Sequence, residues 1–441
     1  MAATAKKTPT SAAPDAVVPR RWLMTVGVLL LLTWGAWWFV SLRQPAPHLL
    51  YGSPIGTTDR FTTIPSWSLV GLDFQHNYGG VNVWLHGGNP YRAMDNDPMN
   101  ARYIYPPLTL AAFAWTGAFP AAAAIPVKLL RPNGEFTFFY SPKAVYVWLV
   151  VSVSICVLAA WRSRRAREQL QLPSLPLLLT AGATLISYPV MFELERGNCN
   201  VLPLLAIFSV VWLLQRPRSW AADFGIAACV VLATGIKAYP GIVILGLVAL
   251  RHYRAALLAG GLLVALLAAT WNAHLSWLQI VRELTTDDAT SYYECAHSLA
   301  MHWQILWRDL HLAGLSKIPA TPAVAAAVLL IVAQVCWRVL KSRSPANHAW
   351  PFLLWLTAMG TFVNKISIDY NLIFVPFALF ALWDYRDRWW THVVLFACVL
   401  WCQPFYLGFS GAALLLLKFL SVAAVGQLIC HRIAREEMTT G

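Results

Sequence analysis

An acidic residue beside a long apolar segment is the feature of this sequence best placed to do chemistry. Asp73 lies between a hydrophobic stretch, residues 23–42, and two turn motifs, Gly87-Gly88-Asn89-Pro90-Tyr91 and Tyr105-Pro106-Pro107-Leu108. The hydrophobic stretch is long enough to cross a bilayer, so we expect Asp73 to lie just outside a membrane. A carboxylate held at the boundary of water and lipid can act as a base on a hydroxyl group.

The residues around Asp73 predict a helix. Apolar side chains follow it at helical spacing, namely Phe74, Tyr78, Val81 and Leu85. Gly87 to Pro90 should end this amphipathic, interfacial helix. A first-turn acid that stabilises the helix is the other interpretation of Asp73. Asp59 competes with it as a base, whereas Asp95 and Asp97 fall in a sequence typical of an exposed turn.

Two polar groups between apolar segments are candidates for binding an anion. Residues 193–200 form a polar turn that contains Arg196, and ionisable groups at membrane depth are usually functional or paired. Pairing of Arg196 with Glu195 is the structural alternative. Lys237 has apolar neighbours on both sides, and a cation held there can bind a phosphate. Snorkelling of Lys237 to the interface is the alternative in its case.

His297, His302 and the motif that begins at Asp369 are weaker candidates for a functional site. His297 and His302 are five residues apart with no third ligand nearby, so hydrogen bonding to a substrate or phosphate is favoured over zinc binding. Asp369 opens an apolar segment after Asn364 and Lys365, where a helix cap with a counter-charge is the structural alternative. No phosphate-binding loop, dinucleotide motif or hydrolase motif is present. We therefore expect no metal and no cofactor.

Composition indicates a membrane protein. The chain is 58% hydrophobic and 12% charged, and apolar segments of about 20 residues recur along it. Its net charge of +13 comes largely from short basic runs beside these segments, such as residues 162–167 and 251–254. Such runs orient membrane insertion and contact anionic lipids. They form no basic, aromatic-interleaved surface, so nucleic acid is excluded as a partner.

Placing the basic runs in the cytoplasm predicts the topology. We expect a disordered cytoplasmic tail over residues 1–21, ordered exterior loops over 43–105 and 273–318, and a cytoplasmic tail over 431–441. Residues 106–130 should form a re-entrant or interfacial pair of half-helices. The fold class is an all-α polytopic membrane protein with about twelve spans within 22–430, at about 22–42, 144–161, 173–192, 198–215, 220–235, 239–250, 254–272, 321–339, 347–363, 369–383, 390–407 and 410–429.

These motifs, in this order, resemble those of glycosyltransferase family 87, the polyprenol-phosphate-mannose-dependent membrane mannosyltransferases of the GT-C superfamily. The resemblance covers about residues 70–385. The matching positions are Asp73, Tyr78, Gly88-Asn89-Pro90-Tyr91, Tyr105-Pro106-Pro107, Gly197-Asn198-Cys199-Asn200, Lys237-Ala238-Tyr239-Pro240, His297-Ser298 and Asp369-Tyr370-Asn371. Asn198 replaces a glutamine of the family pattern, and Tyr370-Asn371 replaces paired histidines.

The resemblance implies a GT-C-type bundle and an inverting transfer of a sugar, mannose first, from a polyprenyl-phosphate donor to a lipid or glycan acceptor. Asp73 would be the base, and Lys237, His297 and Arg196 would hold the donor phosphate. The remaining matches would contact substrate, namely Tyr78, Tyr91, Tyr105, Asn198, Asn200 and Asp369. The active site would face the exterior, or periplasm, of the cell (inner) membrane. A polyprenyl-phosphate-arabinose donor, or a transporter or flippase of lipid-linked sugars, are the alternatives.

Overall fold

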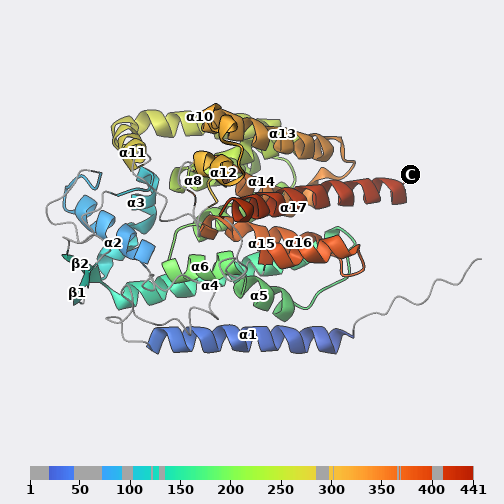
Figure 1. The fold of residues 1–441 in the computed structure, drawn as a ribbon, viewed down its shortest axis with the longest axis horizontal. Coiled ribbons are helices and arrows are strands. Elements are labelled where there is room, and N and C mark those ends of the chain that lie inside the picture. Colours follow the sequence, from blue (N-terminus) through green and yellow to red (C-terminus); the bar gives the residue numbers. More distant parts are fainter. Residues whose placement is uncertain are drawn as a thin grey trace, which may run out of the picture.

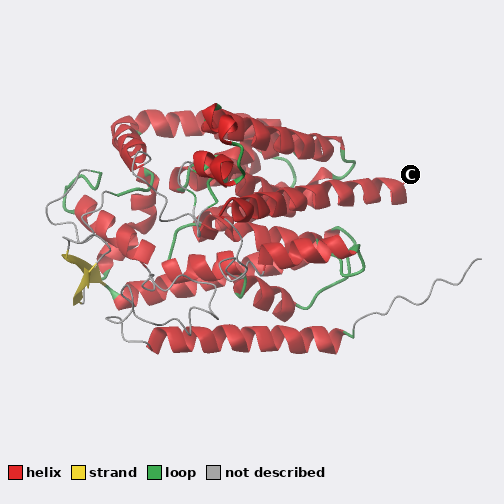
Figure 2. Ribbon diagram, in the orientation of Figure 1, coloured by secondary structure: helices red, strands yellow, loops and turns green. Residues whose placement is uncertain are grey.

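The fold is taken from a computed structural model of the chain. It describes residues 19–43, 72–91, 103–120, 123–128, 135–284, 297–300, 302–364, 367, 369–399 and 411–440. Nearly all of these residues are helical, and Figure 2 shows the helices in red around one small pair of strands in yellow. The predicted all-α architecture is therefore confirmed for the bundle. Asp59, Asp95 and Asp97 lie outside the described residues.

The elements follow one another along the chain with short connections. The first third holds α1 (Arg20–Arg43), α2 (Leu72–Leu85), α3 (Pro107–Phe113), η2 (Ala114–Ala118), β1 (Ala123–Lys128), β2 (Glu135–Tyr140) and α4 (Pro142–Gln169). The middle holds α5 (Leu177–Leu185), α6 (Tyr188–Arg196), α7 (Val201–Leu214), α8 (Trp220–Ile236), η3 (Tyr239–Ile242), α9 (Val243–Ala249), α10 (Tyr253–Ala269) and α11 (Trp271–Leu284). The last third holds α12 (Trp303–Asp309), η5 (Ala313–Lys317), α13 (Ala320–Lys341), η6 (Pro345–His348), α14 (Ala349–Thr361), η7 (Asp369–Ile373), α15 (Phe374–Leu382), α16 (Trp389–Val399) and α17 (Gly411–Thr440).

Among the described residues, three helices are long and apolar enough to cross a membrane. They cover 143–169, 320–341 and 412–438, and the number rises to five if each of two bent helix pairs is one span. The predicted count of about twelve is not confirmed, because most of the other apolar helices have only 10–17 residues. The segment that we expected as a C-terminal tail continues α17 as far as Thr440.

One of the two bent pairs interrupts a predicted span, 173–192, and the other bends near the predicted end of the span 254–272. Helices α5 and α6 meet at 65°, and Pro189 lies in the first turn of α6, where the missing N–H is tolerated. Helices α10 and α11 meet at 88° around Thr270, whose hydroxyl donates to the Leu266 carbonyl at 2.6 Å. Helix α11 thus occupies the start of the predicted 273–318 loop.

The prediction of paired half-helices over 106–130 was wrong in its second half. Helix α3 and η2 form the first half, but Ala123–Lys128 is a strand. It pairs antiparallel with β2, in a register that sets Ala123 opposite Tyr140 and Lys128 opposite Glu135. Strand pairing satisfies the backbone polar groups of this segment, which a short helix containing Pro126 would leave unpaired.

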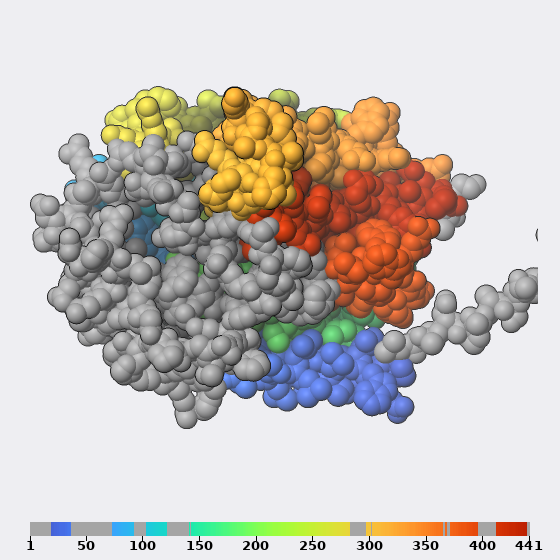
Figure 3. Space-filling model, in the orientation of Figure 1, coloured from blue at the N-terminus to red at the C-terminus, as the bar shows by residue number. Residues whose placement is uncertain are grey.

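Helix α1 packs closely against α5 on the outside of the bundle. A Cβ added to Gly27 would lie 2.4 Å from the Leu179 backbone nitrogen, so α1 touches α5 backbone to backbone. In Figure 3 α1 forms a blue band along one edge of the molecule. Helices α14 and α15 form the centre instead, since almost all of their side chains are buried.

The two ends of the bundle differ in content. Helices α2 and α3 and the hairpin gather at one end, and the C-terminal end of α17 lies at the other (Figure 1). Helix α4 begins beside the hairpin and carries Arg162 to Arg167 away from it, toward its C-terminal end. The polar motifs of α2 are therefore separated from this basic run by the length of the bundle.

Candidate active site

Helix α2 positions Asp73 in its first turn, as predicted. The helix ends before Gly87, whose φ of +80° is readily adopted only by glycine. The Gly88 N–H then donates to the Val83 carbonyl at 2.9 Å and closes the end. However, the helix is not simply amphipathic, because its polar residues are buried as well, namely Asp73, Gln75, His76 and Asn77. Its first half, residues 73–78, is inserted into the protein, whereas Trp84 and Leu85 at its end are exposed.

The carboxylate of Asp73 bonds to the turn between α6 and α7. Arg196 donates to Oδ1 from Nε at 3.1 Å and from Nη2 at 2.8 Å, and Asn198 donates to Oδ2 from Nδ2 at 2.6 Å. Asp73 is 8% exposed and Arg196 7%. Arg196, which we considered as a partner of Glu195, forms an ion pair with Asp73. Residues more than a hundred positions apart meet here.

A left-handed residue makes this contact possible. Gly197 ends α6 with φ of +61°, and the Asn198 N–H donates back to the Glu193 carbonyl at 3.2 Å. This is the Schellman arrangement, which favours glycine because other side chains clash at positive φ. The turn exposes neither Asn198 nor Asn200, which are both fully buried. It aims the Asn198 amide at Asp73.

Tyr105 and Lys237 complete the group. The Asn198 amide also donates to the Tyr105 hydroxyl at 3.0 Å, and Lys237 Nζ lies 4.4 Å from the centre of the Tyr105 ring. Such a cation–π contact holds an ammonium group without neutralising it. Lys237 follows the end of α8, and Thr109 of α3 donates to the Ile236 carbonyl at 2.9 Å, which ties this junction to Tyr105. Asp73 and two cations are therefore gathered within a few side chains.

Glu193 is a second buried carboxylate that we did not select from the sequence. Its Oε2 accepts from Asn200 Nδ2 at 2.8 Å, and the Tyr239 hydroxyl donates to Asn200 Oδ1 at 2.5 Å. Asn200, a predicted substrate contact, is therefore engaged in holding the α6–α7 turn against the Lys237 junction. A glutamate within an apolar sequence is the signal that could have found it.

A histidine and a tyrosine in contact with the site were also missed. His76 stacks on Tyr103 with ring centres 5.4 Å apart, and the Tyr103 hydroxyl donates to Asn77 Oδ1 at 2.8 Å. The Ile104 N–H donates to His76 Nε2 at 3.3 Å. Burial lowers the pKa of His76 to about 4, against a smaller opposing effect of Asp73. His76 is thus a neutral hydrogen-bond acceptor at physiological pH.

Other predicted site residues hold the scaffold. Tyr78 donates to the Phe119 carbonyl at 2.6 Å and joins α2 to the end of η2. Tyr91 donates to the Tyr105 carbonyl at 3.0 Å. His297 is buried, with its Nε2 2.8 Å from both the Thr361 and the Ser367 hydroxyl oxygens.

Asp369 begins η7, which packs against α6, but its side chain lies outside the described part of the structure. The structure therefore joins Asp73, Arg196, Asn198, Tyr105 and Lys237. It places His297 beside the end of α14, in contact with Thr361 and Ser367.

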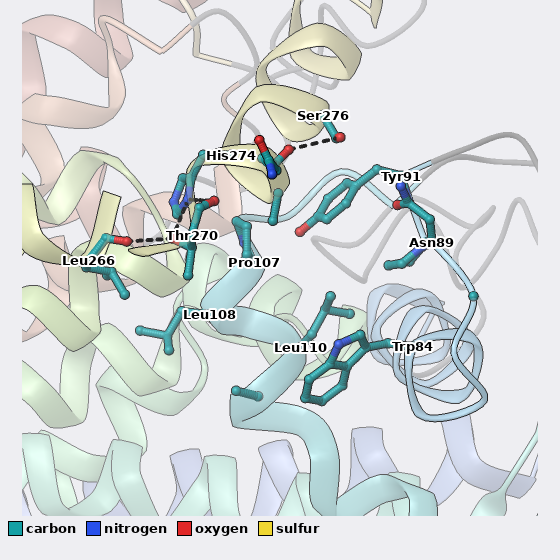
Figure 4. Close-up of a pocket in the computed structure, with 15 residues that line it drawn as sticks. Trp84, Asn89, Tyr91, Pro107, Leu108, Leu110, Leu266, Thr270, His274 and Ser276 are labelled. Carbon is teal, nitrogen blue, oxygen red and sulfur yellow. Dashed lines mark hydrogen bonds between the residues drawn. The ribbon is translucent and has the colours of Figure 1, made fainter. Parts of the chain in front are cut away.

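A cavity of about 580 Å³ borders this group (Figure 4). Trp84 and Tyr91 line it from the α2 side, Leu110 from α3, and Thr270 and His274 from the bend between α10 and α11. Within the described ranges, no three His, Cys, Asp or Glu side chains are grouped so that they could hold a metal ion.

Together, the apolar helical bundle and the buried, charged group at one end define a membrane protein with an enclosed polar site. The model of glycosyltransferase family 87 matches residues 103–363, more than half of the chain. The chain therefore belongs to this family and is a glycosyltransferase, as the motifs predicted. Neither the curated proteins nor the solved structures compared with it gave a match. The matched region begins after α2, so it includes Arg196 and Lys237 but not Asp73.

Proposed function

We propose that this glycosyltransferase moves mannose from a polyprenyl-phosphate donor to a hydroxyl group of an exterior lipid or glycan acceptor, with inversion at the sugar carbon. The observation that carries the proposal is the contact of Asp73 with Arg196 and Asn198, next to Lys237 above Tyr105. A base for the acceptor and cations for a leaving phosphate lie in one buried group. Apolar helices around it fit a donor that stays in the lipid.

The chemistry needs a single carboxylate. The acceptor oxygen attacks the anomeric carbon, the bond from that carbon to the phosphate oxygen breaks, and the hydroxyl proton passes to Asp73. Oδ1 of Asp73 accepts two hydrogen bonds from Arg196, whereas Oδ2 accepts one from Asn198. Oδ2 therefore retains a lone pair for the proton. The phosphate leaves as an anion, so no general acid is required.

Lys237 is the cation that we assign to this leaving phosphate. Lys237 lies over the Tyr105 ring, and a hydrogen bond from an ammonium group to a phosphate is charge-assisted and therefore of the stronger kind. Arg196 and His297 remain proposed phosphate contacts, although Arg196 is already engaged by Asp73 and His297 by hydroxyl groups. The substrate contacts nearest to Asp73 would be Tyr105 and Asn198. Tyr78, Tyr91, Asn200 and Asp369 remain proposed contacts further out.

Membership of a glycosyltransferase family removes the transporter or flippase alternative. The arabinose donor remains as the second candidate. We further propose that the site faces the exterior of the inner membrane. The separation of α2 from the basic run at the end of α4 supports this orientation, since basic runs favour the cytoplasmic side.

A donor assay tests the proposal. Purified protein in lipid bilayers would be given radiolabelled polyprenyl-phosphate-mannose and, in parallel, polyprenyl-phosphate-arabinose, together with a lipid extract as acceptor. We expect label from the mannose donor in a larger glycolipid and little from the arabinose donor. Transfer from the arabinose donor alone would replace the sugar assignment. Transfer from a nucleotide sugar but from neither lipid donor would refute the donor class.

A further inference from the structure

We propose that the cavity between α2, α3 and the α10–α11 bend is the acceptor subsite, and that it takes an uncharged hydroxyl-bearing group such as a pyranoside. The proposal rests on the transferase function proposed above and names its acceptor class. The cavity has a volume of about 580 Å³, within the range typical of small-molecule sites. Figure 4 shows Trp84 and Tyr91 on one side and Thr270 and His274 on the other, with Leu110 between them.

His274 gives the strongest indication of a ligand. It is 5% exposed, and its Nδ1 lies 3.1 Å from the Thr270 carbonyl oxygen and 2.8 Å from the Thr270 hydroxyl. A carbonyl oxygen only accepts, and the Thr270 hydroxyl already donates to the Leu266 carbonyl. Nδ1 must therefore carry the hydrogen, which makes Nε2 the acceptor of the neutral ring.

Nε2 of His274 has no hydrogen-bond partner among the described residues. Although His274 as a residue is only 5% exposed, its Nε2 is an accessible atom, so a ligand can reach it. A hydroxyl group in the cavity would donate to it, whereas an alkyl chain would leave it unpaired. The ring is also held in one orientation by Thr270, as a binding residue requires.

Charge separates this cavity from the donor site. None of the described residues that line it is a lysine, arginine, aspartate or glutamate, so it offers no counter-ion for a phosphate. Arg196 instead pairs with Asp73, and Lys237 lies against the ring of Tyr105, and none of these four residues lines the cavity. A phosphate-bearing donor would bind beside these two cations, and an uncharged acceptor would bind in the cavity.

The cavity is linked to the Asp73 group, and its lining suits a sugar ring. Tyr91 lines it and donates to the Tyr105 carbonyl, and the Tyr105 hydroxyl reaches Asp73 through the Asn198 amide. One layer of tyrosines thus separates the two sites. The rings of Trp84 and Tyr91 offer apolar faces with a polar edge, which suits a sugar ring with C–H faces and equatorial hydroxyls.

The test uses octyl α-D-mannopyranoside, below its micelle concentration, as acceptor and as ligand. In the full-length protein in lipid bilayers, we expect it to accept sugar and, without donor, to raise the unfolding temperature. His274→Leu should raise the acceptor KM about tenfold, abolish the thermal shift and leave the donor KM unchanged. His274→Gln, which retains an acceptor oxygen, should keep most of both effects. His392→Leu, at an exposed histidine of α16, is the matched control.

Trp84→Ala provides a second variant, because Trp84 is 43% exposed and tolerates change, with Trp271→Ala at 57% as its control. Unchanged KM and thermal shift in both His274→Leu and Trp84→Ala would overturn the proposal. Equal stabilisation by octyl phosphate would also overturn it, since the cavity would then bind only the alkyl chain. If octyl mannoside binds through His274 but no sugar leaves a polyprenyl-phosphate donor, the acceptor subsite stands and the proposed donor fails.

Discussion

Replacing Asp73 by asparagine should abolish transfer and also destabilise the protein, and the two effects can be separated. Its side chain is 11% exposed and that of Arg196 8%, with 2.8 Å between Oδ1 and Nη2. Removing one partner of a buried ion pair costs about 3–5 kcal/mol, because the other charge loses its counter-ion. Loss of a positioned base lowers kcat by about 10²–10⁴-fold. The activity of this single variant therefore cannot separate loss of folded protein from loss of the base.

The double variant Asp73→Asn/Arg196→Gln resolves this ambiguity. It removes both charges, so we expect unfolding in a denaturant series to return most of the way to that of the wild type. Transfer from the polyprenyl-phosphate donor should stay below about one hundredth of wild type, because asparagine cannot take the acceptor proton. Arg196→Gln alone should lose stability and retain measurable transfer.

Recovery of activity together with stability in the double variant would show that Asp73 is only a structural counter-charge. Asp59 is the matched comparison, since it was the strongest competing acid in the sequence. If Asp73→Asn keeps more than about a tenth of the activity while Asp59→Asn abolishes it, the assignment of the base is wrong.

Three further predictions concern charge and sidedness. Lys237→Ala should lower kcat/KM for the donor by one to two orders of magnitude, since a hydrogen bond to a charged group is worth about 1.5–3 kcal/mol; unchanged donor kinetics would return Lys237 to a snorkelling role. The pKa of His76 falls from 6.5 to about 4 on folding. As the pH falls below 6.5, the unfolded chain takes up a proton that the folded protein does not bind, so the free energy of unfolding should drop by about 3 kcal/mol between pH 6.5 and 4. A His76→Gln variant should lack that drop in its unfolding temperature. In a cysteine-free background, a cysteine at Asn96 should react with an impermeant label on intact cells and one at Gly441 should not, and the reverse result would invert the topology.

The fold class followed from composition because a bilayer restricts the possible architectures. Apolar stretches in a chain that is 58% hydrophobic leave helices as the expected solution, and the bundle is helical. Helix α8 spans Trp220–Ile236, close to its predicted limits of 220 and 235. A local signal also gave the end of α2, since Gly87 was expected to stop it and positive φ is a property of a single residue; α6, in contrast, continues to Arg196, beyond the predicted limit of 192.

The count of spans and the breaks within them depended on packing. The bend of 65° between α5 and α6 divides the predicted span 173–192 into two helices with different directions. Hydrophobicity does not distinguish a straight span from a bent one, because both bury similar side chains. The strand at Ala123–Lys128 is stabilised by pairing with β2, and β propensity depends on such context more than helix propensity does.

For the candidate site, the sequence by itself determined which residue types were available and at which ends of apolar segments they lie. It singled out Asp73, Arg196 and Lys237, because polar groups at membrane depth are costly and stand out from their surroundings. Tyr105 and Asn198 came from the resemblance to the family; the match over 103–363 confirms the family, and the roles of the site residues stay predictions.

Only the tertiary structure decided which of these residues meet. Asp73 binds Arg196 of a distant helix, and His297 contacts Thr361 and Ser367, which lie 64 and 70 positions further along the chain. Hydrogen bonds and ion pairs act over about 3 Å, whereas sequence patterns report only which face or end of an element a residue occupies. The contacts that make a site are therefore set by how the helices pack, and this information is not local to any one segment.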